Sequence, residues 1–148
     1  MLRLAEQVAS PHAARMQFHQ GYIDAAPDGP FDAVTSILTF QFIPHDQRLE
    51  TLKQIRRRLK IGAPLILVHL SFPQTEPERS IWIARHVAFG LSNGTDPTRV
   101  KSARRAINDR LTILSPEDEV AMMQEAGFSN TALFYAGMSI KGWAAYAQ

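Results

Sequence analysis

Hydrophobic and polar residues recur along the chain with two different periods, and the changes of period predict a mixed order of helices and strands. Apolar positions spaced three and four apart predict a helix over residues 1–9 and another from about residue 45 to Gly62. Residues 15–22 alternate as a short strand, and residues 31–42 and 64–70 are continuous apolar runs. Such runs are typical of strands buried on both faces of a parallel sheet.

The second half of the chain predicts helices first and a hairpin last. Residues 76–111 carry two helical stripes, the second of which begins at Asp96-Pro97, and a further helix begins at Ser115 and ends at Gly127. Two strand patterns follow, at residues 128–135 and 139–146. Their connection is so short that the two strands are expected to pair antiparallel.

This order predicts an α/β domain with a mainly parallel sheet. The length of 148 residues and the 45% of hydrophobic residues suit one globular domain. A formal net charge of +2 is too weak a field to require or exclude nucleic acid. No segment approaches the roughly 20 apolar residues of a membrane-spanning helix, and Glu6 and Gln7 interrupt the only N-terminal stretch that could resemble a signal peptide. Together with the absence of cysteine, this favours a cytoplasmic protein.

Several kinds of chemistry are excluded or disfavoured by residue type and spacing. Without cysteine there is no disulfide, no thiolate metal site and no cysteine nucleophile. No metal site is expected either, because no two histidines stand at ligand spacing: the five are His12, His19, His45, His69 and His86. The chain has neither the serine elbow of hydrolases nor a glycine-rich phosphate loop.

The remaining candidate groups lie where predicted strands end, at residues 21–24, 37–41 and 69–72. In open α/β sheets, ligands bind outside the carboxyl ends of the strands. Gly21 would allow a ligand to approach the backbone closely. Asp24 would accept hydrogen bonds from hydroxyl groups, although an aspartate that simply forms the following turn is an equal alternative.

Four segments in order resemble the class I S-adenosylmethionine-dependent methyltransferases. Residues 1–5 resemble the helix after the family's acidic second strand, and residues 31–34 resemble its fourth strand. Residues 59–67 resemble the entry into the fifth strand, and residues 125–128 resemble the segment before the closing hairpin. The family binds its cofactor through a glycine-rich loop after the first strand and an acid at the end of the second. Neither element occurs in this sequence.

The resemblance therefore implies one partial methyltransferase domain over residues 1–148, with an incomplete Rossmann-like sheet that lacks the first two strands. The expected sheet is mainly parallel and ends in the antiparallel hairpin. A truncated gene, a fragment or a mis-called start would each explain this expectation. Because the missing strands leave an apolar edge unpaired, a homodimer is one expected consequence.

A narrower resemblance points to the carboxy-S-adenosylmethionine synthases and their methyltransferase relatives. Residues 39–44 with Gln47 and Arg48 resemble their segment after the fourth strand, and Ser71-Phe72 resembles their segment after the fifth. The Asn those synthases use for the carboxylated cofactor falls on Ile37, and their carboxylate-binding Arg falls on Arg104. The chain is thus expected to be a relative and not that enzyme.

By this resemblance, S-adenosylmethionine is the cofactor and residues 71–111 form a helical segment on the acceptor side. The residues expected to bind the cofactor are Gly21, Tyr22, Ile23, Ile37, Leu38 and Phe42. Those expected to bind the acceptor are His45, Trp82, His86 and Arg104. Core packing for Trp82, a surface position for His86 and a solvated charge for Arg104 are the structural alternatives. No catalytic base is assigned, and His45 and His69 are the candidates.

The acceptor itself stays open between a small molecule and an RNA or protein group. Three functions follow from the sequence. The first is the C-terminal part of a methyltransferase, expected to be inactive alone because the glycine-rich cofactor loop is absent. The second is a non-catalytic interaction domain that dimerises through the exposed sheet edge. The third is a carboxy-S-adenosylmethionine synthase-like enzyme.

Overall fold

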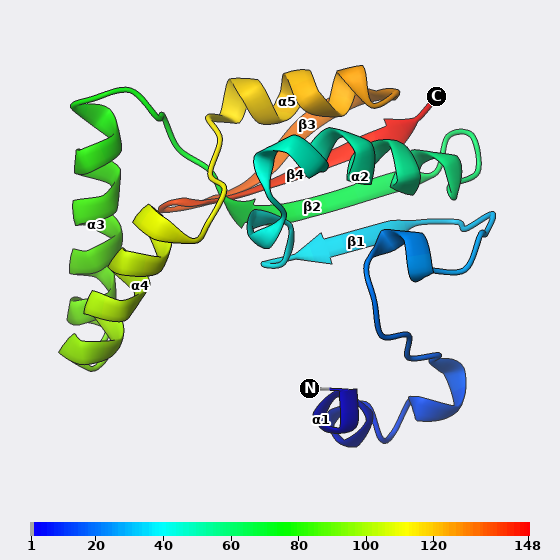
Figure 1. Cartoon of the computed structure of the whole chain (residues 1–148), viewed down its shortest axis with the longest axis horizontal. Helices are drawn as coiled ribbons and strands as arrows, with labels where there is room; N and C mark the ends of the chain where they lie inside the picture. Colours follow the sequence, from blue (N-terminus) through cyan, green and yellow to red (C-terminus); the bar gives the residue numbers. More distant parts are fainter. Residues whose placement is uncertain (1) are drawn as a thin grey trace.

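A computed structural model describes residues 2–148 and contains one four-stranded mixed sheet (Figure 1). The strands are β1 (Val34–Ile37), β2 (Pro64–Leu70), β3 (Phe128–Gly137) and β4 (Ile140–Ala147). Their spatial order is β1-β2-β4-β3. Strands β1 and β2 are parallel, whereas β4 pairs antiparallel with both β2 and β3.

The expected antiparallel hairpin is confirmed, but the expectation of a mainly parallel sheet is wrong. Only the β1–β2 pair, which is joined by a helical crossover, is parallel within residues 2–148. The chain runs out along β3 and returns through a tight turn into β4, which lies between β3 and β2. A strand that returns in this way runs antiparallel to both of its neighbours.

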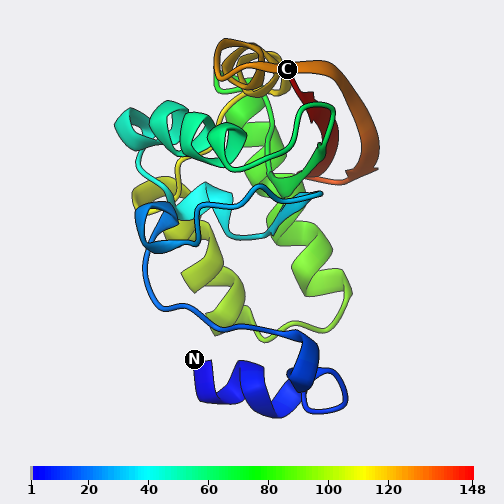
Figure 2. The same cartoon turned by 90° about the vertical axis from the view of Figure 1, so that its right-hand side faces the viewer.

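Residues 2–148 contain five α-helices, which lie in three groups. Helices α2 (His45–Arg57) and α5 (Pro116–Glu125) cover one face of the sheet (Figure 1). Helices α3 (Glu78–Ser92) and α4 (Pro97–Asp109) pack together beyond the carboxyl end of β2, and α1 (Leu2–Val8) lies apart from the sheet (Figures 1 and 2). None of the helices in the described part is long and apolar enough to span a membrane.

The helix starts follow from local hydrogen bonding. Asp96 accepts hydrogen bonds from the backbone N–H groups of Thr98 and Arg99, and Ser115 accepts one from Asp118. Each cap is followed by a proline at the first helical position, where the missing N–H costs nothing. The predicted starts of α4 and α5 are therefore confirmed.

Two strand predictions in the first third of the chain fail. Residues 15–22 form no strand: a short 3₁₀ helix at Ala13–Arg15 is followed by irregular chain. Of residues 31–42, only β1 is a strand, and Phe40–Phe42 form a 3₁₀ helix. A strand needs a hydrogen-bonded neighbour, and an alternating pattern alone supplies none. None of residues 3–30 is buried. The helix predicted over residues 1–9 is confirmed over α1. Met1 lies outside the described residues.

The buried side chains form two clusters. The larger one lies between the sheet and the α2–α5 layer, around Leu52, Leu65 and Met123. The smaller one joins the end of β2 to α3 and α4 through Leu70, Ile83 and Ile107. The second cluster fixes the two helices against the carboxyl end of the parallel pair, which is where an open α/β sheet binds ligands.

Candidate functional site

A cavity of about 270 Å³ opens at the carboxyl ends of β1 and β2, beneath α3 and α4. Its walls come from the end of each parallel strand, from both helices and from the start of β4. The lining side chains are mostly apolar: Leu38, Gln41, Phe42, Leu70, His86, Ala103, Ala106, Ile107, Leu111 and Ile140. We call this space the strand-end pocket. It has the mostly apolar wall and few polar groups that are typical of small-molecule sites.

The turn after β1 shapes one side of the strand-end pocket. Leu38 adopts a positive φ of 56°, which is unusual for a bulky residue, and its backbone N–H donates to the Val68 carbonyl at 2.7 Å. Backbone strain of this kind is held only where surrounding contacts fix it, and it is common beside ligand sites. Here the bend turns Leu38 and Phe42 toward the pocket.

Gln41 holds three segments of the pocket wall together. Its side-chain Oε1 accepts a hydrogen bond of 3.0 Å from the Leu70 backbone N–H at the end of β2. Its own carbonyl accepts one of 2.9 Å from Thr112, just after α4. Gln41 is only 7% exposed, so these bonds are protected from water. From the sequence, Gln41 is only the last residue of the predicted strand end at residues 37–41, and no role is predicted for its side chain.

His86 is the only titratable side chain among the residues that line the strand-end pocket. Its Nδ1 lies 2.6 Å from the hydroxyl oxygen of Ser139, which is itself buried at 1% exposure. The Ser139 carbonyl accepts a hydrogen bond from Ser71, so the turn before β4 is tied to the end of β2. Burial lowers the pKa of His86, and the ring is therefore uncharged at neutral pH.

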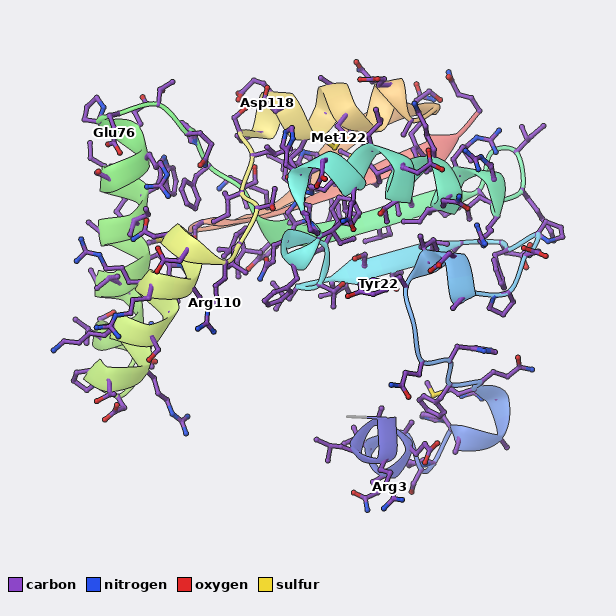
Figure 3. The ribbon with its side chains drawn as sticks, viewed as in Figure 1. Arg3, Tyr22, Glu76, Arg110, Asp118 and Met122 are labelled. Carbon is purple, nitrogen blue, oxygen red and sulfur yellow. The ribbon has the colours of Figure 1, made fainter. Side chains whose placement is uncertain are left out.

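The other three residues expected to bind the acceptor lie elsewhere. Trp82 packs against the smaller core cluster, with Arg85 5.1 Å and Lys141 4.8 Å from the centre of its ring. Arg104 is exposed on α4 and does not line the pocket. His45 lines a separate cavity of about 530 Å³ between α2 and α5, the side on which Figure 3 labels Asp118 and Met122.

The residues expected to bind the cofactor are divided between two places. Leu38 and Phe42 line the strand-end pocket, and Ile37 lies exposed at the end of β1. Tyr22 and Ile23 instead line a cavity of about 380 Å³ against the start of α2. Figure 3 shows Tyr22 beside β1, well away from the α4 end that Arg110 marks.

Gly21 has a local reason to be glycine. Its φ is +147°, and a Cβ built there would lie 2.6 Å from the Cβ of Ala25. A side chain at this position would collide with the following turn. The glycine therefore serves the turn into Ile23–Ala25, and it does not line the strand-end pocket.

A buried charged cluster joins α2, β2 and α5 behind the pocket. His69 Nε2 lies 2.8 Å from Glu119 Oε1, and Arg48 Nη1 lies 3.0 Å from the same oxygen. The guanidinium of Arg48 also stacks 4.6 Å from the centre of the Phe40 ring. All three charged or titratable side chains are 0% exposed. Burial lowers the pKa of Arg48, an effect that the attraction of Glu119 opposes.

This cluster decides the role of His69. Because Nε2 faces a carboxylate oxygen, it carries the proton and donates to Glu119. The ring is enclosed by Phe40 and Trp143, and His69 does not line the strand-end pocket. His69 is therefore a core residue and not a base in contact with a substrate. Within residues 2–148, no three His, Asp or Glu side chains gather to hold a metal ion.

Comparison with known proteins places the chain among methyltransferase-related sequences. A family model described as a methyltransferase domain matches residues 1–67. The carboxy-S-adenosyl-L-methionine synthase of Ectopseudomonas mendocina (strain ymp) is 33% identical over 106 residues, which cover 72% of this chain and 43% of that enzyme. The enzyme of the same name from Pseudomonas putida (strain KT2440) is 31% identical over 120 residues, which cover 81% and 49%. The chain spans about half the length of these curated relatives.

Solved structures share the fold at low identity. A putative O-methyltransferase from Nostoc punctiforme matches with a TM-score of 0.70 and 15% identity, over 98% of this chain and 41% of that one. The pyocyanin biosynthetic protein PhzM matches with a TM-score of 0.69 and 12% identity, over 99% and 40%. PigF, solved with SAH, matches with a TM-score of 0.66 and 15% identity, over 98% of this chain and 39% of that one. At these identities the likeness concerns the fold alone.

Proposed function

The chain belongs to the class I S-adenosylmethionine-dependent methyltransferases, and from this premise we propose that it forms the acceptor-binding side of a methyl-transfer site. The observation that supports this proposal is the strand-end pocket at the carboxyl ends of the one parallel strand pair. Its volume of about 270 Å³ suits a small molecule and not an RNA base together with its backbone. Holding such an acceptor in one orientation is the main contribution a protein makes to in-line transfer.

The described residues do not fit the whole cofactor. At the end of β1, Ile37, Leu38 and Phe42 are 57%, 45% and 63% exposed and offer apolar contact only. S-adenosylmethionine also carries an amino group, a carboxylate and ribose hydroxyls, which need polar partners when they are bound. Tyr22, Ile23 and Asp24 line a different cavity. The residues at this end of the sheet therefore form the acceptor side of the site and not the whole cofactor site.

Calorimetric titration of S-adenosylmethionine tests this division. We expect weak or no binding to the 148-residue chain. We expect binding near micromolar for a chimera in which the first two strands and glycine-rich loop of the Pseudomonas putida relative precede this chain. Tight binding to the 148-residue chain alone would contradict the proposal, and so would a folded chimera that does not bind.

A synthase-like activity is the second candidate, because the relatives that share 31–33% identity carry the name carboxy-S-adenosyl-L-methionine synthase. In the same chimera, Arg104→Gln would abolish selectivity for the carboxylated cofactor if Arg104 bound its extra carboxylate. Unchanged selectivity would remove this candidate. The exposed position of Arg104 outside the strand-end pocket supports the first proposal over the second.

A third candidate, an interaction domain, rests on the outer edge of β1. Within the described part, β1 pairs only with β2, and Thr35 and Ile37 are exposed along it. An unpaired edge is a template for a second copy of the chain. Size-exclusion chromatography with light scattering would then give a dimer that Thr35→Lys converts to a monomer. A monomeric wild-type chain would contradict this candidate.

A further inference from the structure

The polar atoms of the strand-end pocket determine what kind of small molecule it selects. Eight of its ten lining residues are Leu, Phe, Ala or Ile, and only Gln41 and His86 offer hydrogen-bonding side chains. A ligand that fills this space must therefore be mostly apolar, and its polar atoms must meet these two side chains.

Gln41 offers a donor to the pocket. Its Oε1 is committed to the Leu70 backbone N–H at 3.0 Å, which fixes the orientation of the amide. No hydrogen bond of its Nε2 is found within residues 2–148, and the residue as a whole is only 7% exposed. A ligand oxygen in the pocket that accepts from this free N–H would gain a hydrogen bond.

His86 offers a second donor, because Ser139 sets its tautomer. The Ser139 hydroxyl is buried, and His86 Nδ1, at 2.6 Å, is its only hydrogen-bond partner in the described part. If Nδ1 carried the proton, the hydroxyl hydrogen would be left without an acceptor. The hydroxyl therefore donates to Nδ1, and the ring proton lies on Nε2. At neutral pH the ring has no charge, because burial lowers the pKa of His86.

The charge of the site favours an uncharged ligand. None of the ten lining residues is a Lys, Arg, Asp or Glu, and Lys141 on the neighbouring β4 donates to the Met138 carbonyl and lies over Trp82. A carboxylate brought into this pocket would lose its hydration without gaining a cation. An uncharged carbonyl oxygen, which accepts two hydrogen bonds, meets both donors without that cost.

We propose that the strand-end pocket binds a small apolar molecule through an uncharged carbonyl oxygen that accepts hydrogen bonds from Gln41 Nε2 and His86 Nε2. This inference rests on the proposed function and names its acceptor class. It also gives the Ser139 hydroxyl a role, since that group keeps the Nε2 proton available to the ligand.

Three probes of nearly equal size separate the alternatives: acetophenone has a carbonyl, α-methylstyrene replaces its oxygen with a methylene, and benzoate has a carboxylate. Titration of the isotope-labelled 148-residue chain, followed by NMR, would measure each affinity and locate each ligand. We expect acetophenone to bind about tenfold more tightly than α-methylstyrene, because two neutral hydrogen bonds are gained, and benzoate to bind most weakly. The Gln41 amide and His86 ring signals should shift with acetophenone.

Two variants test the donors separately. His86→Phe keeps a flat ring but removes Nε2–H, and Gln41→Glu keeps an acceptor for the Leu70 N–H but removes the amide donor. Each should bring the acetophenone affinity close to that of α-methylstyrene. Arg104→Gln, outside the pocket, is the matched control and should leave both affinities unchanged.

The wild-type results alone can overturn the inference. Equal affinities for acetophenone and α-methylstyrene, with shifts at the strand-end pocket, would contradict the carbonyl preference and leave the proposed acceptor site standing. Tightest binding of benzoate would contradict the preference for an uncharged oxygen. Absence of binding by all three probes would contradict the acceptor site itself, and the inference with it.

Discussion

His69 and His86 both lie near the carboxyl end of β2, but their surroundings differ in charge and in access. His69 is fully buried, donates to Glu119 and is enclosed by Phe40 and Trp143. His86 is half-buried, has the Ser139 hydroxyl on Nδ1 and lines the strand-end pocket. The His69 ring belongs to a charged cluster in the core, whereas the His86 ring is uncharged at neutral pH and lines a pocket that a ligand could enter.

The contrast shows how a histidine in an apolar setting is assigned a role. His69 is fully buried and His86 is half-buried, but the hydrogen-bond partner of each ring separates their roles more clearly. His69 Nε2 donates to Glu119 in a buried cluster that also contains Arg48, whereas the partner of His86 is a serine hydroxyl and its Nε2 makes no hydrogen bond within the described residues. Residues of the second kind are the candidates for binding.

Breaking the His69 cluster should have the largest effect on stability. Glu119→Ala leaves the Arg48 guanidinium buried without its carboxylate, and we expect the free energy of unfolding to fall by about 3–5 kcal/mol. Urea unfolding followed by circular dichroism measures the change. Glu117→Ala, at an exposed position of the same helix, is the control and should change stability by less than about 0.5 kcal/mol. A loss below about 1 kcal/mol for Glu119→Ala would show that the cluster does not hold these elements together.

Removing the partner of His86 should cost less and should change the ring itself. Ser139→Ala deletes one buried hydrogen bond, and we expect a loss of about 0.5–1.5 kcal/mol of stability. Nitrogen chemical shifts of the labelled ring would show the Nε2–H tautomer in the wild-type chain and a mixture of tautomers in the variant. An Nδ1–H tautomer in the wild-type chain would contradict the proposed donor.

The fold was predictable where local signals and packing agree. The caps at Asp96 and Ser115 and the short connection before β4 located two helices and the hairpin correctly. The strand at residues 15–22 failed because its alternating pattern gives no information about a partner strand, and the structure provides none for it. The number of parallel pairs was also wrong, since it depends on where the hairpin joins the sheet.

The candidate site was predictable only in part, for a related reason. The strand-end rule pointed to residues 37–41, of which Leu38 and Gln41 line the strand-end pocket, and Phe42 and His86, expected on the cofactor and acceptor sides, line it as well. The roles of Gln41 and Ser139 were not predicted, because they come from contacts across 29 and 53 positions of sequence. Trp82 and Arg104 were expected to bind the acceptor, but Trp82 packs against the smaller core cluster and Arg104 is exposed on α4.

The pH dependence of stability should separate His86 from the rest of the chain. Burial lowers the pKa of His86 in the folded state below its ordinary value of 6.5. As the pH falls below that value, the unfolded chain binds a proton before the folded chain does, so the free energy of unfolding decreases. His86→Phe should remove this contribution, and its unfolding free energy should fall less between pH 7 and acidic pH. Parallel curves for the two proteins would contradict the effect.

The smallest effect should come from Arg104, which tests whether the pocket ends where the structure places its wall. Arg104 is exposed on α4, next to the lining residue Ala103, and no ion pair of its side chain is found within the described residues. Arg104→Gln removes one charge from solvent, so we expect a change in stability within about 0.5 kcal/mol. The acetophenone affinity should also stay within about twofold, since no hydrogen bond joins Arg104 to Gln41 or His86 within the described residues. A larger loss of affinity would mean that the Arg104 guanidinium reaches the ligand. The strand-end pocket would then not be an uncharged site, and its contrast with the charged His69 cluster would no longer hold.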